Sequence, residues 1–175
     1  MHGNTVPPYA QQPDVRIKRV RDFAIKHSKM GSLSVHGVAH WDRVAKNADS
    51  LRTGDVDILV VKVFSYLHDI ERVNDNGDPE HGTRAAQLVD NIRHTLLDFL
   101  DDVEIRQLKE ACALHTTTWR TEDATVNACF DADRLDLLRV GITPYPGMMA
   151  TLAGRILAEK MRLDNPESEW LLNGG

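Results

Sequence analysis

The residues best suited to chemistry are an adjacent histidine and aspartate, His68 and Asp69, which close the apolar run Phe64–Leu67. An imidazole and a carboxylate are both good ligands for a divalent metal ion. Adjacent residues on a helix point about 100° apart, so the two side chains share one ion only near a helix end. Alone, the doublet is more typical of a helix that happens to end in two polar residues.

Other histidines and aspartates stand beside apolar stripes or at predicted helix ends. His36 and His40 are one turn apart on one face of a predicted helix, and His81 follows the polar loop after the doublet. His115 ends an apolar stripe, so its ring is expected to point inward. Three aspartates share one short segment: Asp131, Asp133 and Asp136. Each has an ordinary explanation as a cap, a surface group or a solvated carboxylate, but together they favour a metal site.

The composition is that of a globular protein with one sizeable core. The chain has 175 residues, of which 42% are hydrophobic, and a formal net charge of −5. This charge does not favour binding to a nucleic-acid polymer, and no apolar run is long enough to span a membrane. Cys112 and Cys129 lie in helical patterns and are expected to be free, buried thiols. The start of the chain has no apolar signal-peptide core, so a cytoplasmic location is the default expectation.

Apolar periodicity predicts an all-α fold, a single helical bundle domain of about seven helices. The domain is expected to cover residues 14–164, between a disordered N-terminal arm, 1–13, and a flexible C-terminal tail, 165–175. One helix, capped by Asp55 or Asp57, is rich in β-branched residues, but its length and spacing favour a helix over a strand. The densest group of turn residues is the loop 71–79. The expected helices cover residues 15–29, 34–52, 57–69, 80–100, 103–116, 124–139 and 148–163.

The order of His40, the doublet His68-Asp69 and a distant aspartate resembles the signature of the HD-domain superfamily of metal-dependent phosphohydrolases. His40 matches the first histidine of that family because a valine follows it at the family's position. Asp133 is the best match to the last aspartate, since the segment Ala132–Leu135 resembles the family's Ala-Asp-Arg/Lys-Leu, and Asp131 is the second choice. The resemblance covers roughly residues 34–140. It implies a helical fold with the metal in the bundle interior, in agreement with the periodicity.

Two further histidines, His81 and His115, fit positions where dinuclear members of that family place additional ligands. The chain lacks the Gly-Tyr-Pro signature of the cyclic-di-nucleotide branch. Some nucleotidase members have a glutamate three residues after the doublet aspartate; here that residue is Arg72, with Glu71 before it. The resemblance therefore implies a site with more ligands than the minimal single-metal pattern has.

The function implied is metal-dependent hydrolysis of a small phosphorylated substrate, a nucleotide or a related phosphate ester. One or two divalent ions would be the cofactor, with Mn, Mg, Fe, Ni, Co and Zn equally compatible. Asp69 would bridge two ions, Arg72 and Arg134 would bind the phosphate, and Glu71 or His36 would move protons. The implied metal ligands are His40, His68, Asp69, Asp133, His81 and His115.

Two alternatives remain open at this stage. Some dinuclear relatives hold a pair of irons with the same ligand types and activate dioxygen, so an oxygenase is the second hypothesis. The third is a non-catalytic module that binds a nucleotide or a metal. The expected partners are a small phosphorylated substrate and, as one option, a second copy of the chain, without a nucleic-acid polymer or a membrane.

Overall fold

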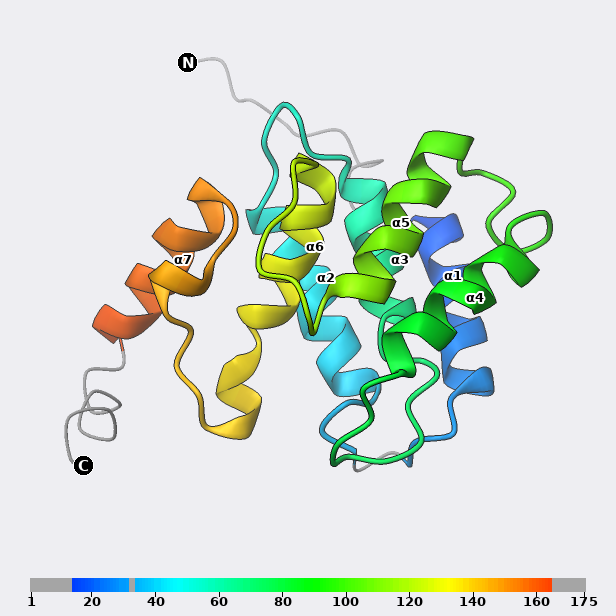
Figure 1. Cartoon of the computed structure of the whole chain (residues 1–175), viewed down its shortest axis with the longest axis horizontal. Helices are drawn as coiled ribbons and strands as arrows, with labels where there is room; N and C mark the ends of the chain where they lie inside the picture. Colours follow the sequence, from blue (N-terminus) through cyan, green and yellow to red (C-terminus); the bar gives the residue numbers. More distant parts are fainter. Residues whose placement is uncertain (1–13, 32–33, 165–175) are drawn as a thin grey trace, which may run out of the picture.

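The most apolar helix, α3 (Ile58–Leu67), lies at the centre of the molecule in the computed structural model, which describes residues 14–31 and 34–164 (Figure 1). Eight of its ten residues are buried. A helix that is apolar on all sides is stable only when other helices surround it, which explains why this valine-rich segment is helical here. Asp57 caps its start, because its carboxylate accepts hydrogen bonds from the backbone N–H groups of Leu59 and Val60.

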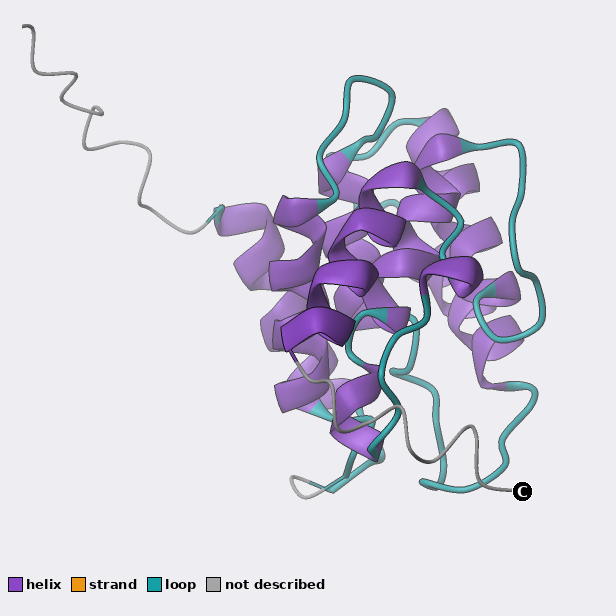
Figure 2. Cartoon of the chain, turned by 90° about the vertical axis from the view of Figure 1, so that its left-hand side faces the viewer, coloured by secondary structure: helices purple, strands orange, loops and turns teal. Residues whose placement is uncertain are grey.

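Six more α-helices surround α3 or pack against its neighbours, and the described residues contain no strand (Figure 2). The all-α prediction is therefore confirmed. α4 (His81–Ile92) packs against α5, and α7 (Leu152–Asp164) packs against α6. The helices that contact α3 itself are α1 (Val15–His27), α2 (Val38–Ser50), α5 (Asp102–Leu114) and α6 (Ala124–Arg134).

None of the helices in the described ranges is long and apolar enough to cross a membrane. Cys112 and Cys129 are free and buried, as predicted. The predicted N-terminal arm and C-terminal tail lie outside the described residues.

Three helices differ at their ends from the periodicity prediction. α4 ends at Ile92 rather than near residue 100, because the Ile92 carbonyl accepts from the N–H groups of Thr95, Leu96 and Leu97 and winds the chain into turns. The apolar stripe that suggested a longer helix is still used, since Leu97 is fully buried in those turns. α6 likewise ends at Arg134, and a short 3-10 helix, η2 (Leu137–Val140), follows it.

The start of α7 is fixed by a buried carboxylate on α6. Asp131 accepts hydrogen bonds from the backbone N–H groups of Ala150 and Thr151, at 2.7 and 2.8 Å, and from the Thr151 hydroxyl at 2.7 Å. The prediction that this helix begins at Met148 was therefore wrong, because residues 146–148 form the separate 3-10 helix η3 (Pro146–Met148). Asp131 thus has a structural task that its sequence position did not indicate.

Candidate metal centre

Five helices bring their polar ends to one place in the bundle. His68 is the C-terminal cap of α3, and Asp69 follows in the turn that leaves it, so the doublet wraps around a helix end as predicted. His40 lies in the first turn of α2, and His81 is the first residue of α4. His115 is the C-terminal cap of α5. Asp133 joins them from the last turn of α6.

The histidines meet in two pairs. The Nε2 atoms of His40 and His68 are 3.1 Å apart, and those of His81 and His115 are 3.0 Å apart. All four rings are buried. We refer to His40, His68 and Asp133 as the first group and to His81 and His115 as the second group.

Asp69 lies between the two groups and presents one oxygen to each. Its Oδ2 is 3.8 Å from His40 Nε2 and 3.6 Å from His68 Nε2. Its Oδ1 is 3.0 Å from His81 Nε2 and 3.7 Å from His115 Nε2. On each side, one atom from Asp69 and one from each ring lie within 4.8 Å of one another. This is the arrangement that a bridging carboxylate requires.

The Nδ1 atom of every ring faces a hydrogen-bond acceptor. His40 Nδ1 is 2.7 Å from Asp136 Oδ2, and His115 Nδ1 is 2.8 Å from the Cys112 carbonyl. His68 Nδ1 faces the carbonyls of Phe64 and Ser65, and His81 Nδ1 faces that of Asp78. A neutral ring that donates from Nδ1 carries a lone pair on Nε2. When both rings of a pair are neutral, their lone pairs point at each other, which is unfavourable unless a metal ion or a proton lies between them.

Asp133 adds a second sign that a cation belongs in the first group. Its Oδ1 is buried and makes no hydrogen bond within the described part of the chain, although it lies 3.3 Å from His40 Nε2. A buried carboxylate oxygen without a donor is costly, and a metal ion would satisfy it. Asp131, two residues earlier, points away to the start of α7. Nitrogen and oxygen donors of this kind fit divalent first-row cations.

Charge is distributed unequally among the rings. Burial lowers the pKa of His68 to about 3, so this ring stays neutral. Burial also lowers the pKa of His40 and His115, but the carboxylates beside each ring outweigh it, and both pKa values are raised. Burial raises the pKa of Asp69, and the facing imidazoles overcome that effect and hold it well below its usual range.

Two of the other predicted residues lie beside this cluster. His36 Nδ1 is 2.9 Å from Asp69 Oδ2, and its side chain is 15% exposed. Arg72 is buried; its Nε donates to Asp69 Oδ1 at 3.2 Å, and its Nη1 donates to the carbonyls of Asn74 and Asn76. Arg72 therefore connects the bridging carboxylate to the polar loop.

The structure does not bring Glu71 and Arg134 to the cluster. Glu71 turns toward the end of α1, where its carboxylate lies 2.6 Å from His27 Nε2 and 3.3 Å from Lys29 Nζ. Arg134 donates to the carbonyls of Thr118, Trp119 and Met148. Its position next to Asp133 in sequence suggested a phosphate contact, but on a helix the two side chains point in different directions.

Two residues that do lie here were not among the predicted site residues, although Asp136 belongs to the aspartate-rich segment singled out in the sequence. Asp136 supports His40 from behind and is itself held by Arg43, whose Nε and Nη2 donate to it at 2.6 and 3.0 Å. Arg139, from η2, places its Nη2 3.9 Å from Asp133 Oδ1. Asp136 carried a signal, since it shares the aspartate-rich segment. Arg139 carried none, because the expected long helix gave no reason to turn it inward.

A glycine sets the distance between the two helices of the second group. A Cβ atom at Gly82, the residue after His81, would overlap the Cys112 carbonyl oxygen on α5 and would lie 3.3 Å from His115 Cε1. Only glycine therefore allows α4 and α5 to approach this closely.

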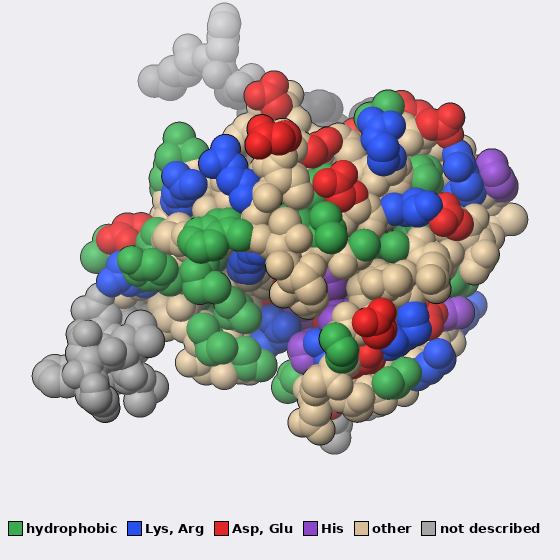
Figure 3. Space-filling model, viewed as in Figure 1, with side chains coloured by type: hydrophobic (Ala, Val, Ile, Leu, Met, Phe, Trp, Pro, Cys, Tyr) green, Lys and Arg blue, Asp and Glu red, His purple; other side chains and the backbone are tan. Residues whose placement is uncertain are grey.

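The two largest cavities recorded for the described residues differ in their relation to the cluster. A groove of about 860 Å³ is lined by His40, Asp136 and Arg139 together with residues of α2. Histidine side chains are visible in the central hollow of the face shown in Figure 3, beside Lys and Arg side chains.

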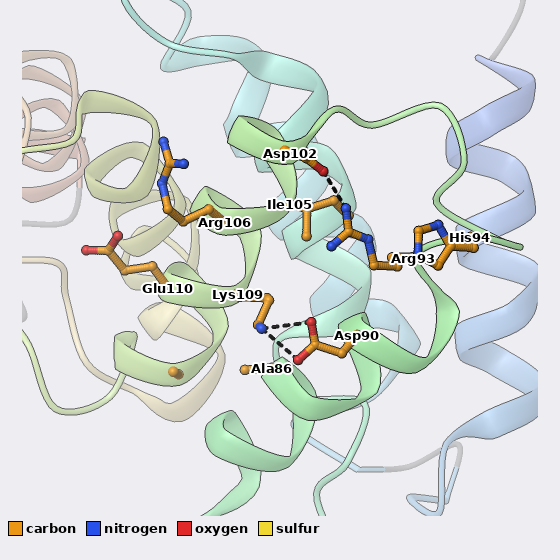
Figure 4. Close-up of a pocket in the computed structure, with 10 residues that line it drawn as sticks. Ala86, Asp90, Arg93, His94, Asp102, Ile105, Arg106, Lys109 and Glu110 are labelled. Atoms are coloured by element: carbon orange, nitrogen blue, oxygen red, sulfur yellow. Dashed lines mark hydrogen bonds and ion pairs between the residues drawn. The ribbon is translucent and has the colours of Figure 1, made fainter.

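The other cavity, of about 790 Å³, lies on α4 and α5 and contains none of the candidate ligands (Figure 4). Its charges are compensated locally, because Lys109 pairs with Asp90 and Arg93 pairs with Asp102.

Comparison with known proteins supports the fold. No family model matches the chain, and no curated protein matches it. A crystal structure described as a predicted HD superfamily hydrolase from an uncultured Thermotogales bacterium is similar to it, with a TM-score of 0.67 and 24% sequence identity over 91% of each chain. The resemblance predicted from the sequence is thus confirmed at the level of architecture: this chain shares its helical fold with a protein described as a predicted HD superfamily hydrolase.

Proposed function

We propose that the protein is a metal-dependent phosphohydrolase that acts on a small phosphate ester. The observation that carries this proposal is the position of Asp69, with one oxygen toward each of two facing imidazole pairs. Such an array could hold two divalent cations, with Asp69 as a ligand to both. The similar crystal structure is described as a predicted hydrolase, which agrees with this class of reaction.

The first group and Asp69 would hold one cation, and the second group and Asp69 would hold the other. Divalent ions in such a site lower the pKa of a bound water toward neutrality and polarise a phosphoryl oxygen. The carbonyls and the carboxylate behind each ring keep Nε2 directed at the centre. The protein therefore contributes fixed ligand geometry, which needs no rearrangement when substrate arrives.

Two residues at the edge of the cluster have roles that follow from their contacts. Arg72 holds Asp69 Oδ1 and the loop carbonyls of Asn74 and Asn76, so it fixes the bridging carboxylate and the loop beside it. His36 contacts Asp69 Oδ2 through Nδ1 and is partly exposed. Its position suits the transfer of a proton between the site and solvent.

The test begins with purified protein stripped of metal by a chelator and reloaded separately with Mn²⁺, Mg²⁺, Fe²⁺, Co²⁺, Ni²⁺ or Zn²⁺. Elemental analysis should find two equivalents per chain for the preferred ion. A screen of phosphorylated metabolites should then release inorganic phosphate only with the reloaded protein. Protein that binds no divalent ion under these conditions, or activity that survives complete metal removal, would contradict the proposal.

A second candidate is a dinuclear iron oxygenase, because four imidazoles and two carboxylates also suit a pair of irons. The two functions separate in one experiment on iron-loaded protein. An oxygenase consumes dioxygen with its substrate and shows iron absorption changes in air, whereas a phosphohydrolase releases phosphate equally well without oxygen. Arg72 and Arg139, whose side chains are only 10% and 9% exposed beside the cluster, favour the phosphate ester.

A further inference from the structure

Arg139 is a partly buried cation, and its hydrogen-bonding capacity is incompletely used. Its side chain is 9% exposed; Nε donates to the Val35 carbonyl at 3.0 Å and Nη1 to the Asp136 carbonyl at 3.1 Å. Nη2 makes no hydrogen bond within the described residues, and its nearest carboxylate oxygen is Asp133 Oδ1, at 3.9 Å. Nη2 is therefore free to bind an anion, and a guanidinium suits the oxygens of a phosphate or a carboxylate.

Arg139 is also one of the residues that line the groove beside His40. Three cations line this groove, Arg43, Lys46 and Arg139, against one carboxylate, Asp136. That carboxylate is already bonded to His40 and Arg43. The groove is therefore positive in a chain whose net charge is −5.

Lys46 is a second cation of the groove without a protein partner among the described residues. It is exposed, lies two turns after His40 on α2, and has no hydrogen bond or ion pair with any described residue. The groove measures about 860 Å³, a volume typical of sites that hold a whole small molecule and larger than a single phosphate needs. One cation near Asp133 and another on α2 thus offer contacts to two separate anionic groups.

We propose that this groove binds the leaving part of the substrate, and that the substrate is a phosphate ester whose leaving part carries a second anionic group, a phosphate or a carboxylate. Arg139 binds a phosphoryl oxygen at the end of the groove next to Asp133, and Lys46 binds the distal anion. Arg43 stays paired with Asp136 and adds to the positive field. This inference rests on the proposed phosphohydrolase function and adds to it the class of substrate.

Non-hydrolysable probes test the groove without turnover. We would titrate the Mn²⁺-loaded full chain, in a calorimeter, with propylphosphonate and with alkane-α,ω-diyl bisphosphonates of increasing chain length. At the best length the bisphosphonate should bind at least about tenfold more tightly than the monophosphonate, the smaller effect expected of one hydrogen bond between charged groups. Equal affinities at every length would overturn the proposal.

Matched variants assign the two contacts. Lys46→Met should abolish the preference for the bisphosphonate and leave propylphosphonate affinity unchanged. Lys26→Met, which removes the same charge from the exposed surface of α1, should leave both affinities unchanged. Arg139→Met and the milder Arg139→Lys should weaken both probes, with the metal content and the circular dichroism spectrum as checks on folding. A bisphosphonate preference that persists in Lys46→Met would refute the distal site.

The failures of the two proposals are distinguishable. Metal-dependent phosphate release from simple monoesters, without any bisphosphonate preference, would support the phosphohydrolase proposal and contradict the groove proposal. A bisphosphonate preference that depends on Lys46, in a protein that hydrolyses no ester, would support the groove proposal and contradict the phosphohydrolase proposal.

Discussion

The two groups of the candidate metal centre are built from the same ring type but are supported differently. In the first group the rings meet two carboxylates, Asp69 and Asp133, and a third, Asp136, supports His40 from behind. In the second group the rings meet only Asp69 and are supported by backbone carbonyls. More negative charge around the first group means stronger attraction for a cation, so the first position should fill before the second.

The largest loss of metal and of activity should follow the removal of Asp69, the residue that both groups share. Asp69→Ala removes an oxygen from each side, so both metal equivalents should be lost and activity should fall by about a hundred- to a thousandfold or more. Elemental analysis and phosphate release measure the two effects. Asp49→Ala is the control, because Asp49 is exposed and pairs only with surface cations. Retention of one full equivalent in Asp69→Ala would show that the two positions are independent.

Next in size is the contrast between two aspartates of α6. Asp133→Ala should lose the first metal equivalent with the fold intact, since the Oδ1 of Asp133 makes no hydrogen bond to lose. Asp131→Ala should keep its metal but lose about 1–3 kcal/mol of stability, because the N–H groups of Ala150 and Thr151 lose their acceptor. Metal content and the thermal unfolding midpoint of both variants check this. Loss of metal in Asp131→Ala, with full metal content in Asp133→Ala, would show that Asp131 is the ligand and Asp133 is not.

The second group should respond separately. His81→Ala or His115→Ala should lose one metal equivalent, keep the other on the first group, and show a large fall in turnover with an unchanged circular dichroism spectrum. Titration of metal-free protein with Mn²⁺ should give two steps for the natural chain and one for each variant. If both variants keep two equivalents and full activity, the site holds its metal on the first group alone.

A smaller effect on metal affinity is expected from changing Asp136, which supports His40 from behind the first group. Asp136→Asn keeps the shape of the side chain but removes the charge that holds His40 Nδ1, so affinity for the first cation should fall by about ten- to a hundredfold. Arg43→Gln should have a weaker effect in the same direction, because it acts only through Asp136. Unchanged affinity in Asp136→Asn would mean that ring orientation is fixed by packing.

The smallest expected effect is the difference in pKa between His68 and His115 in the metal-free protein. With its pKa near 3, His68 should keep neutral-ring NMR signals down to about pH 4. The unfolded chain takes up this proton near 6.5, so acidification from 6.5 toward 3 lowers the free energy of unfolding through His68. The pKa of His115 is raised, so its contribution has the opposite sign: it is present below 6.5 and is lost as pH rises through the folded value. Identical titration of both rings would refute the unequal charge distribution.

The sequence was sufficient where local chemistry decides the structure. An apolar helix that ends in His68-Asp69 predicted both the buried α3 and the wrapping of the doublet around its end. His40 and His68 were predicted to lie in the interior, and both do.

It was insufficient where distant residues compete for a side chain. Glu71 was predicted to act in the site, but His27 at the end of α1 and Lys29 just after it hold it elsewhere. Arg134 was predicted to bind phosphate, but three carbonyls from distant turns take its donors. The early end of α6 brings Arg139 inward instead. Such outcomes depend on tertiary contacts, which helical periodicity does not contain.

The close approach of α4 and α5 at Gly82 has a consequence for the choice of metal. The distance between the His81 and His115 rings depends on how closely the backbones of α4 and α5 approach each other. That approach is possible because residue 82 carries a hydrogen atom where any other residue has a Cβ atom. We therefore expect the size of a cation held between these two rings to depend on a residue that would not touch it. In related or engineered sequences, a change from glycine to alanine here should push α4 and α5 apart and favour a larger cation, although every ligand residue is retained.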